Sequence, residues 1–140
     1  MNKDRESNIT LESYQRKEAV DVYDSEVLKW SERYIFNNYF SRPGVILDLG
    51  CGVGRTSYFL KQLGHKVVAI DYSNAMIERA RIKYRNSGII FELMSADDLR
   101  YPDNTFDYAF FSLSLGLSEV WPLNYIFWQP KGYASPVGVC

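Results

Sequence analysis

The sequence is poor in the residues that build metal centres and catalytic triads. Its 140 residues include one histidine, His65, and two cysteines, Cys51 and Cys140, which lie far apart in the chain. Zinc sites and thiol redox motifs need several such residues at close spacing. A serine–histidine–aspartate triad needs a histidine beside both of its partners. We therefore expect no metal site and no such triad, and we interpret His65 as an exposed residue at the start of a strand.

The chain also has little excess charge of either sign. Lysine and arginine number 16, aspartate and glutamate number 17, and the formal net charge is −1. Surfaces that bind nucleic acids are usually strongly basic, so the composition indicates no nucleic-acid partner, although a modified base or nucleotide stays open as a substrate. With 46% hydrophobic and 24% charged residues, the composition is that of a soluble globular protein with one domain.

Long uninterrupted hydrophobic runs are missing as well. Residues 1–7 are mostly polar or charged and lack the apolar core of a signal peptide. Near the C-terminus, Glu119 and Pro122 interrupt an apolar stretch well short of the roughly 20 residues that cross a bilayer. We therefore expect no membrane segment and a cytoplasmic location.

The most informative stretch is residues 45–56, which read VILDLGCGVGRT. Three apolar residues lead to Asp48, and glycines then follow at alternate positions, at Gly50, Gly52 and Gly54. A segment with helical spacing comes next. This order predicts a buried strand, a tight loop whose backbone a ligand can approach closely, and a helix. In open α/β sheets such a loop lies at the carboxyl ends of the strands, where ligands bind.

The charge beside this loop indicates the kind of ligand. A dinucleotide-binding loop follows G-x-G-x-x-G and places a pyrophosphate on the helix N-terminus. Here Arg55 and Ser57 stand where the third glycine would fall in the two possible registers. Asp48 would repel a pyrophosphate but attract an ammonium or sulfonium group, with a gain on the order of a few kcal/mol before desolvation. The loop therefore favours a nucleoside that carries a cation, and a dinucleotide-dependent oxidoreductase is the weaker alternative.

Strand and helix patterns alternate along the rest of the chain. We expect strands near residues 45–49, 66–70, 89–94 and 107–111. Helices are expected between the first three, and Ser73 is placed to cap the second of these helices. An earlier helix is expected to begin at Asp24 or Ser25. Its expected apolar face consists of Val27, Trp30, Tyr34 and Ile35. This alternation predicts right-handed βαβ units and a parallel sheet.

The motif Asp48-x-Gly50-x-Gly52-x-Gly54 resembles the first motif of class I S-adenosylmethionine-dependent methyltransferases. The resemblance continues through the later segments VVAIDYS and NTFD and covers roughly residues 20–113. It implies an α/β fold, the Rossmann-like three-layer αβα arrangement, with a mainly parallel sheet whose strand order begins 3-2-1-4. It also implies S-adenosyl-L-methionine as the cofactor and transfer of its methyl group to an acceptor, by default a small molecule.

The resemblance implies roles for the acidic residues and the cysteine near the loop. Asp48 would act on the methionine ammonium through water or the loop backbone, or else would only tie down the loop. Asp71 ends the next strand, where a carboxylate can accept hydrogen bonds from both ribose hydroxyls; the alternative is a helix N-cap. Cys51 has no base placed to activate it, so we interpret it as a small residue packed under the loop.

The adenine contacts are less sharply defined. Tyr72 and Met76 are candidates to flank the ring, although Met76 also falls on the core face of its helix. Family members often have an acidic residue at the position of Ser95. Here the Ser95 hydroxyl or Asp97 would replace it, unless Asp97 is only a solvated loop residue, and Ala96 would offer its backbone N–H.

The region of the transferred methyl group is expected at the end of the fourth strand. Phe111 and Ser112 would lie there, unless they are ordinary strand residues. We interpret Tyr14 and Tyr23 as packing at the surface, with closing over the cofactor as the alternative. No catalytic base is identified. The cofactor-binding candidates are therefore Asp48, Gly50, Cys51, Gly52, Gly54, Asp71, Tyr72, Met76, Ser95, Ala96, Asp97 and Phe111.

The two ends of the chain differ from the pattern of the methyltransferase family that the chain resembles. We interpret residues 1–20 as a flexible or lid-like polar segment, residues 21–113 as the cofactor-binding core, and residues 114–140 as an atypical apolar tail. The tail contains only two charged residues, Glu119 and Lys131, and proline and glycine interrupt it. We expect the C-terminal strands to be missing or irregular, as in a truncated or altered chain. The fourth strand would then be an exposed edge prone to self-association, and a non-catalytic cofactor-binding fragment is an alternative to an active enzyme.

Overall fold

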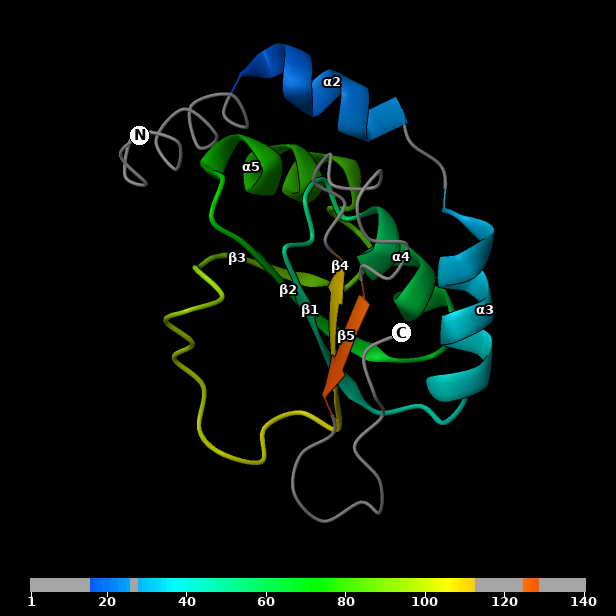
Figure 1. Cartoon of the computed structure of the whole chain (residues 1–140). Helices are drawn as coiled ribbons and strands as arrows, with labels where there is room; N and C mark the ends of the chain where they lie inside the picture. The colour runs from blue at the N-terminus through cyan, green and yellow to red at the C-terminus, as the bar shows by residue number, and fades with distance from the viewer. Residues whose placement is uncertain (1–15, 26–27, 113–124, 129–140) are drawn as a thin grey trace, which may run out of the picture.

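A computed structural model describes residues 16–25, 28–112 and 125–128 (Figure 1). Two helices come first, α2 (Lys17–Ser25) and α3 (Trp30–Tyr39). The elements that follow are β1 (Val45–Leu49), α4 (Arg55–Gln62), β2 (Lys66–Asp71), α5 (Asn74–Lys83), β3 (Ile90–Leu93), β4 (Tyr108–Ser112) and β5 (Tyr125–Trp128). The first four strands and the helices between them lie within two residues of the predicted positions.

The strands form one sheet in the order β3-β2-β1-β4-β5. Pairing is parallel from β3 to β4, which confirms the predicted 3-2-1-4 order. At the centre of the sheet, Asp48 on β1 aligns with Ala69 on β2 and with Phe110 on β4. Because all four parallel strands run the same way, the carboxyl ends of β1, β2, β3 and β4 lie at one end of the sheet, where α2 also lies (Figure 1).

The prediction that β4 forms an exposed edge of the sheet is wrong. β5 pairs with β4 in antiparallel orientation, with Phe127 aligned to Phe110. The four residues of β5 read YIFW, aromatic and β-branched types that favour strands; the prolines and glycines around them obscured this signal. Residues 113–124 and 129–140, the rest of the expected tail, lie outside the described part of the chain.

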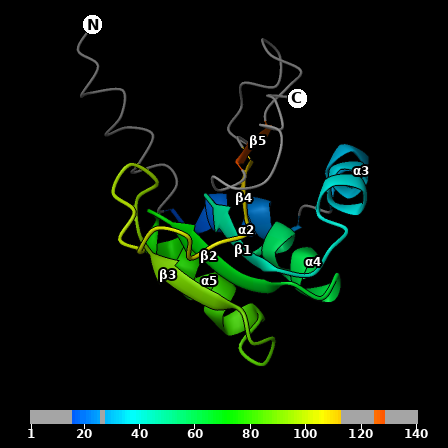
Figure 2. The ribbon, with the colours of Figure 1, turned by 90° about the horizontal axis from the view of Figure 1, so that it is seen from below.

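Helices α3, α4 and α5 cover one face of the sheet (Figure 2). An aromatic group joins this layer to the sheet: the ring of Phe36 on α3 lies 4.7 Å from that of Phe110 on β4, and Phe40 packs beside both. On the opposite face Leu47 and Ile70 pack with Phe106 from the segment that precedes β4. Among the described residues this second face carries no helix (Figure 2).

The N-terminal helices differ from the prediction. Two helices replace the single one expected from residue 24 or 25, and α2 crosses residue 20, where the polar segment was expected to end. The exposed fractions of Trp30 and Tyr34 are 79% and 56%, whereas Ile35 and Phe36 are buried. The expected apolar face was therefore wrong for these two aromatic residues. The packing of Phe36 onto β4 determines which face α3 buries.

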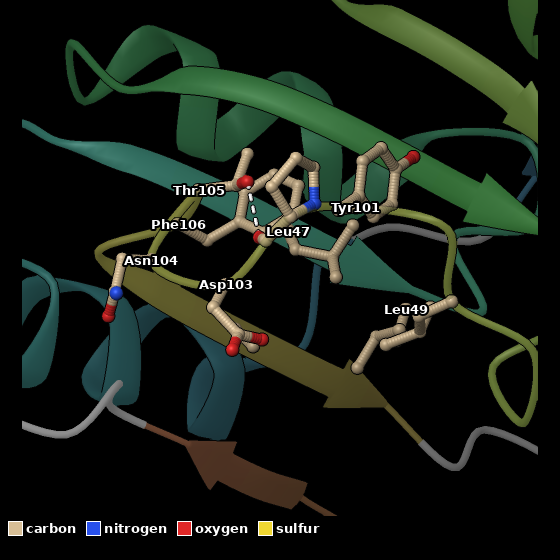
Figure 3. A pocket seen from close by; sticks show the side chains of 10 residues that line it. Leu47, Leu49, Tyr101, Asp103, Asn104, Thr105 and Phe106 are labelled. Atoms are coloured by element: carbon tan, nitrogen blue, oxygen red, sulfur yellow. Dashed lines mark hydrogen bonds between the residues drawn. The ribbon is translucent and has the colours of Figure 1, made fainter.

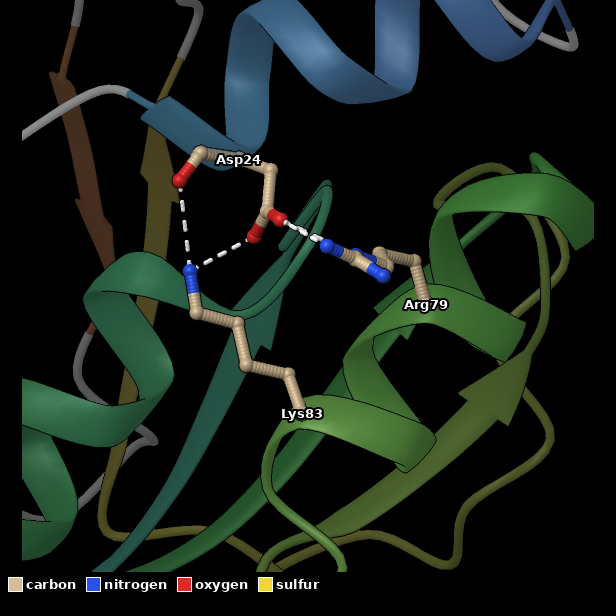
Figure 4. Close-up of polar contacts among 3 residues, drawn as sticks. All are labelled: Asp24, Arg79 and Lys83. Atoms are coloured by element: carbon tan, nitrogen blue, oxygen red, sulfur yellow. Dashed lines mark hydrogen bonds and ion pairs between the residues drawn. The ribbon is translucent and has the colours of Figure 1, made fainter.

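Helix α2 is fastened to α5 by an ionic cluster around Asp24 (Figure 4). The Asp24 carboxylate accepts hydrogen bonds from Lys83 Nζ at 2.6 Å and from Arg79 Nε at 2.9 Å. Its bonds to Lys83 and then to Arg79 lower the pKa of Asp24 below the ordinary value. Close by, Val20 is buried in a small cluster that includes Val53 of the glycine loop. α2 is therefore held over that loop.

The interpretation of His65 as an exposed residue is also wrong. Its side chain is 1% exposed. The Gly44 N–H donates to Nδ1 at 3.2 Å, and Nε2 lies 2.8 Å from the Phe40 carbonyl oxygen, to which it donates. The ring thus joins the end of α3 to the start of β1, at the end of the sheet away from the glycine loop. His65 therefore has a structural role, which the sequence around a single histidine does not indicate.

Candidate functional site

The glycine loop connects β1 to α4 and has the conformation that its sequence predicts. The φ angles are 66° at Gly50, 55° at Gly52 and 87° at Gly54, all in the left-handed region that side chains disfavour. The Cys51 N–H donates to the Ile70 carbonyl at 2.9 Å, and the Gly54 N–H donates to the Cys51 carbonyl at 3.0 Å. The loop is thus fixed against the end of β2.

Two of these glycines have opposite surroundings, and this leads to a prediction. A Cβ at Gly54 would lie 2.8 Å from the Phe91 ring and 3.1 Å from Tyr84, whereas a Cβ at Gly52 would meet no atom within 4 Å. Left-handed backbone costs about 1–2 kcal/mol at either position, and overpacking adds about 1–3 kcal/mol at Gly54 alone. We expect urea unfolding to show Gly54→Ala as the less stable variant.

Gly52→Ala serves as the matched control, because its backbone strain is similar and its side-chain clash is absent. We expect it to lower the affinity for whatever ligand approaches the loop more than it lowers stability. Equal losses of unfolding free energy in the two variants would contradict the packing assigned to Gly54.

Asp48 is fully buried beneath the start of α4. Its Oδ2 accepts hydrogen bonds from Thr56 Oγ1 at 2.7 Å and from Ser57 Oγ at 2.6 Å. Its Oδ1 is buried and has no hydrogen-bond partner among the described residues. Burial raises the pKa of Asp48 to about 6, although the two hydroxyl bonds act in the opposite direction. The carboxylate therefore holds the first turn of α4, and one oxygen has no partner among the described residues.

Asp71 lies at the end of β2, beside the same loop. Its Oδ2 accepts from the Gly52 N–H and its Oδ1 from the Ser73 N–H, both at 2.8 Å. The helix-capping role belongs to Ser73, as predicted, because its hydroxyl oxygen accepts from the Met76 N–H. Asp71 is 8% exposed, and burial raises its pKa above the ordinary value. The Tyr72 N–H also bonds to this carboxylate, and a carboxylate with about four acceptor sites keeps capacity for a further donor.

Other predicted site residues are divided between the core and the surface. Cys51 is buried in the main hydrophobic cluster, which confirms it as a packed small residue, and burial raises the pKa of its thiol, which disfavours the nucleophilic thiolate. Met76 is 2% exposed and packs with Val20 and Val53, so this packing supports its core role. Tyr72, in contrast, is 41% exposed.

The segment after β3 and the end of β4 lie at the same end of the sheet. The Met94 N–H donates to the Asp71 carbonyl at 3.0 Å, which places Ser95 next to the end of β2. Ser95, Ala96 and Asp97 are all exposed, and the Ser95 hydroxyl donates to the Asp97 carboxylate. On the other side, the Phe111 ring lies 3.1 Å from the position that a Gly50 Cβ would take.

Two sets of contacts at the site did not emerge from the sequence. One is the pair of hydroxyls on Asp48, from Thr56 and Ser57. The other is an ion pair between Glu32 on α3 and Arg55 at the start of α4. The helical spacing after the loop predicted a helix, but it did not predict the contacts that side chains in the first turn of this helix make. The side chains of Tyr14, Tyr23 and Ser112, which were also considered for the site, lie outside those the structure describes.

A separate hollow lies on the sheet face opposite α3 (Figure 3). Its volume is about 780 Å³. Its lining consists mainly of Leu47, Leu49, Tyr101, Asn104, Phe106 and Ala109. None of the predicted cofactor-binding residues lines it. The hollow is the less covered part of the second sheet face, distinct from the glycine loop.

The segment around the glycine loop matches a known protein family. Residues 46–124 match the model of a family described as the methyltransferase domain. The chain belongs to this family. The matched range includes the glycine loop, Asp71, the segment after β3 and β4. The alternative of a dinucleotide-dependent oxidoreductase has no comparable support.

Curated relatives and solved structures agree with this assignment. The chain is 40% identical to the ubiquinone/menaquinone biosynthesis C-methyltransferase UbiE of Hydrogenovibrio crunogenus, over 56% of this chain and 34% of that protein. UbiE of Vibrio cholerae is 34% identical, over 62% of this chain and 36% of that protein. The chain thus spans about a third of the length of these methyltransferases.

Among solved structures, the S-adenosylmethionine-dependent methyltransferase of Mesorhizobium loti is 32% identical, with a TM-score of 0.53, over 61% of this chain and 39% of that one. The PH0226 protein of Pyrococcus horikoshii is 33% identical, with the same TM-score, over 69% of this chain and 43% of that one. The fold is accordingly the Rossmann-like methyltransferase fold. None of the described helices has the length and apolar composition needed to cross a membrane.

Proposed function

We propose that this methyltransferase-domain chain binds S-adenosyl-L-methionine at the glycine loop and serves the transfer of its methyl group to a small-molecule acceptor. The observation that carries the proposal is the loop itself. Three left-handed glycines lie between two acidic residues, and the backbone at Gly52 has open space where a side chain would stand. A loop of this kind admits a ligand to the backbone and presents negative charge to it.

The residues present fit this cofactor. Asp71 reaches the surface beside Gly52, and its carboxylate keeps acceptor capacity for a ribose hydroxyl besides the backbone N–H groups that it already binds. Asp48 supplies negative charge beneath the loop, with one oxygen that lacks a partner among the described residues. That charge favours the methionine ammonium and the sulfonium over a phosphate. These two carboxylates and the loop backbone would hold the methionine and ribose parts.

The residues for the adenine and methyl ends of the cofactor are assigned from their positions at the edge of the sheet. Ser95, Ala96 and Asp97 follow β3 next to the end of β2, where their polar groups are exposed and available to adenine. Tyr72 is exposed beside Asp71 and would cover one side of the ring. Phe111 lies against Gly50 and would border the reacting methyl group.

The cofactor would supply a methyl group already activated by the positive sulfur. The protein's task is to hold donor and acceptor in line and to exclude water, so proximity accounts for much of the acceleration. α2 covers the loop through Val20 and Val53 and is fastened by Asp24, which suits it to exclude water. No side chain is assigned as a general base.

The relatives support one class of acceptor. The names of the curated proteins describe C-methyltransferases of ubiquinone and menaquinone biosynthesis, which supports a small molecule rather than a macromolecule for this chain. A cytoplasmic location and self-association through a sheet edge belong to the same proposal; in the described part of the chain, the outermost strand on the β4 side is β5.

The test is a calorimetric titration of the whole chain with S-adenosylmethionine, with its demethylated product S-adenosylhomocysteine, and with a nicotinamide dinucleotide. We expect binding of the first two and not of the third. Circular dichroism on the same sample verifies that the chain is folded. Binding of the dinucleotide alone by a folded chain would contradict the proposal.

A further inference from the structure

A buried ion pair joins α3 to the start of α4. The Arg55 guanidinium binds both oxygens of the Glu32 carboxylate, with Nη2 donating to Oε1 at 2.9 Å and Nη1 donating to Oε2. The side chains of Glu32 and Arg55 are 1% and 14% exposed. The Lys29 N–H also donates to Glu32 Oε2 at 2.8 Å. Each charged group is therefore held in one fixed place, away from most solvent.

Stability alone gives little reason for this pair. A cation at the start of a helix opposes the helix dipole, and Arg55 is the first residue of α4. Burying two charges also costs solvation, and well-packed apolar residues often serve a core equally well. The pair therefore calls for a function besides packing.

The residues that follow Arg55 in the chain indicate what this function is. The next two residues, Thr56 and Ser57, donate their hydroxyls to Asp48 at 2.7 and 2.6 Å. Fixing Arg55 on Glu32 fixes the first turn of α4, and with it the two donors that hold Asp48. The guanidinium also brings a positive charge close to this buried carboxylate.

We propose that Arg55, anchored by Glu32, is a positioning residue that fixes the start of α4 and, through the hydroxyls of Thr56 and Ser57, holds the Asp48 carboxylate beneath the glycine loop. The inference rests on the proposed function, because an ionised Asp48 matters for a cationic cofactor. It assigns roles to two residues that need not touch that cofactor.

The charges around Asp48 make the inference testable. Arg55 lowers the pKa of Asp48 and Glu32 raises it, against the larger upward effect of burial. The other acidic groups at the loop are the Cys51 thiol and Asp71, which face it from the loop and from the end of β2. Removing Arg55 and removing Glu32 therefore have opposite effects on Asp48, although both break the same ion pair.

The experiment follows the Asp48 carboxyl carbon by ¹³C NMR across a pH titration of the unliganded full chain, with Asp48→Asn to assign the signal. We expect Arg55→Met to move the titration midpoint up, and Glu32→Gln, which loses the charge but keeps an oxygen to accept from Arg55, to move it down. Arg33→Met is the matched control. It removes the same charge from α3, where Arg33 lies over the Phe59 ring, and we expect little change.

Titration with S-adenosylmethionine across the same pH range links the effect to binding. We expect the pH at which affinity is half-maximal to follow the Asp48 midpoint in each variant. Arg55→Lys keeps the charge but loses the two-point contact with Glu32, so we expect a smaller upward shift than in Arg55→Met. It and Glu32→Gln carry the test if Arg55→Met does not fold. No upward shift of the Asp48 midpoint in a folded Arg55→Met chain would overturn the inference. Opposite shifts without any binding by the wild type would support the coupling and overturn the proposed function.

Discussion

Replacing Asp71 by alanine is expected to lower the affinity for S-adenosylmethionine by about 10²- to 10⁴-fold. The carboxylate would lose two hydrogen bonds to the ribose hydroxyls, each worth about 1.5–3 kcal/mol because the acceptor is charged. It would also release the Gly52 N–H, which it now holds at 2.8 Å, so the loop would lose part of its fixed shape. Calorimetric titration measures the loss directly.

Two controls separate binding from folding in this prediction. Asp97→Ala removes an exposed carboxylate from the next loop and is expected to cost less affinity, since it offers at most one contact to adenine. Urea unfolding of Asp71→Ala shows whether the variant is folded at the temperature of the titration. Unchanged affinity in a folded Asp71→Ala chain would remove Asp71 from the site.

The parts of the fold that sequence predicted correctly are those with local signals. β1 and β2 are almost wholly apolar, and only such strands fill the centre of a parallel sheet. The loop between β1 and α4 needs left-handed backbone at three positions, and each has a glycine. Ser73 could be recognised as a cap because a hydroxyl just before a helix satisfies its first N–H groups.

The errors occurred where distant contacts override local patterns. Trp30 and Tyr34 have helical spacing, yet α3 buries Phe36 because Phe110 of β4 offers it an aromatic partner. His65 is buried because Phe40 and Gly44 satisfy both ring nitrogens. Neither contact is visible without the sheet.

In the candidate site, too, the sequence predicted the features with local signals but not those that depend on distant contacts. The glycine motif predicted where the loop and its two carboxylates lie, since strand ends in a parallel sheet share one edge. It did not predict that Asp48 is covered by the first turn of α4, or that Arg55 pairs with Glu32. These depend on how α3 and α4 pack, which spacing along the chain does not specify.

Asp48→Asn is expected to change the pH dependence of stability more than any other single substitution at the site. Burial raises the pKa of Asp48 from an ordinary 3.8 to about 6. Between these values the folded state binds more protons than the unfolded state, so the free energy of unfolding falls as the pH rises. About two pKa units correspond to about 3 kcal/mol, and this loss persists at pH 7.

Asparagine has the same shape and keeps an oxygen for the hydroxyls of Thr56 and Ser57, but it carries no charge. The free energy of unfolding of the variant relative to the wild type is therefore expected to rise by about 3 kcal/mol between pH 3.5 and pH 7. Urea unfolding at several pH values measures this difference. Asp97→Asn, at an exposed carboxylate, should show only a small change, and a difference for Asp48→Asn that does not vary with pH would contradict the buried charge.

The same substitution is expected to weaken S-adenosylmethionine binding at pH 7, because the loop would lose the negative charge that favours the cofactor's ammonium. If Asp48→Asn becomes more stable relative to the wild type as the pH rises, yet binds S-adenosylmethionine more weakly, two roles of Asp48 are separated. The hydroxyl bonds that hold α4 need only an oxygen. The charge costs stability in the free protein, so we expect its benefit in binding of the proposed cofactor.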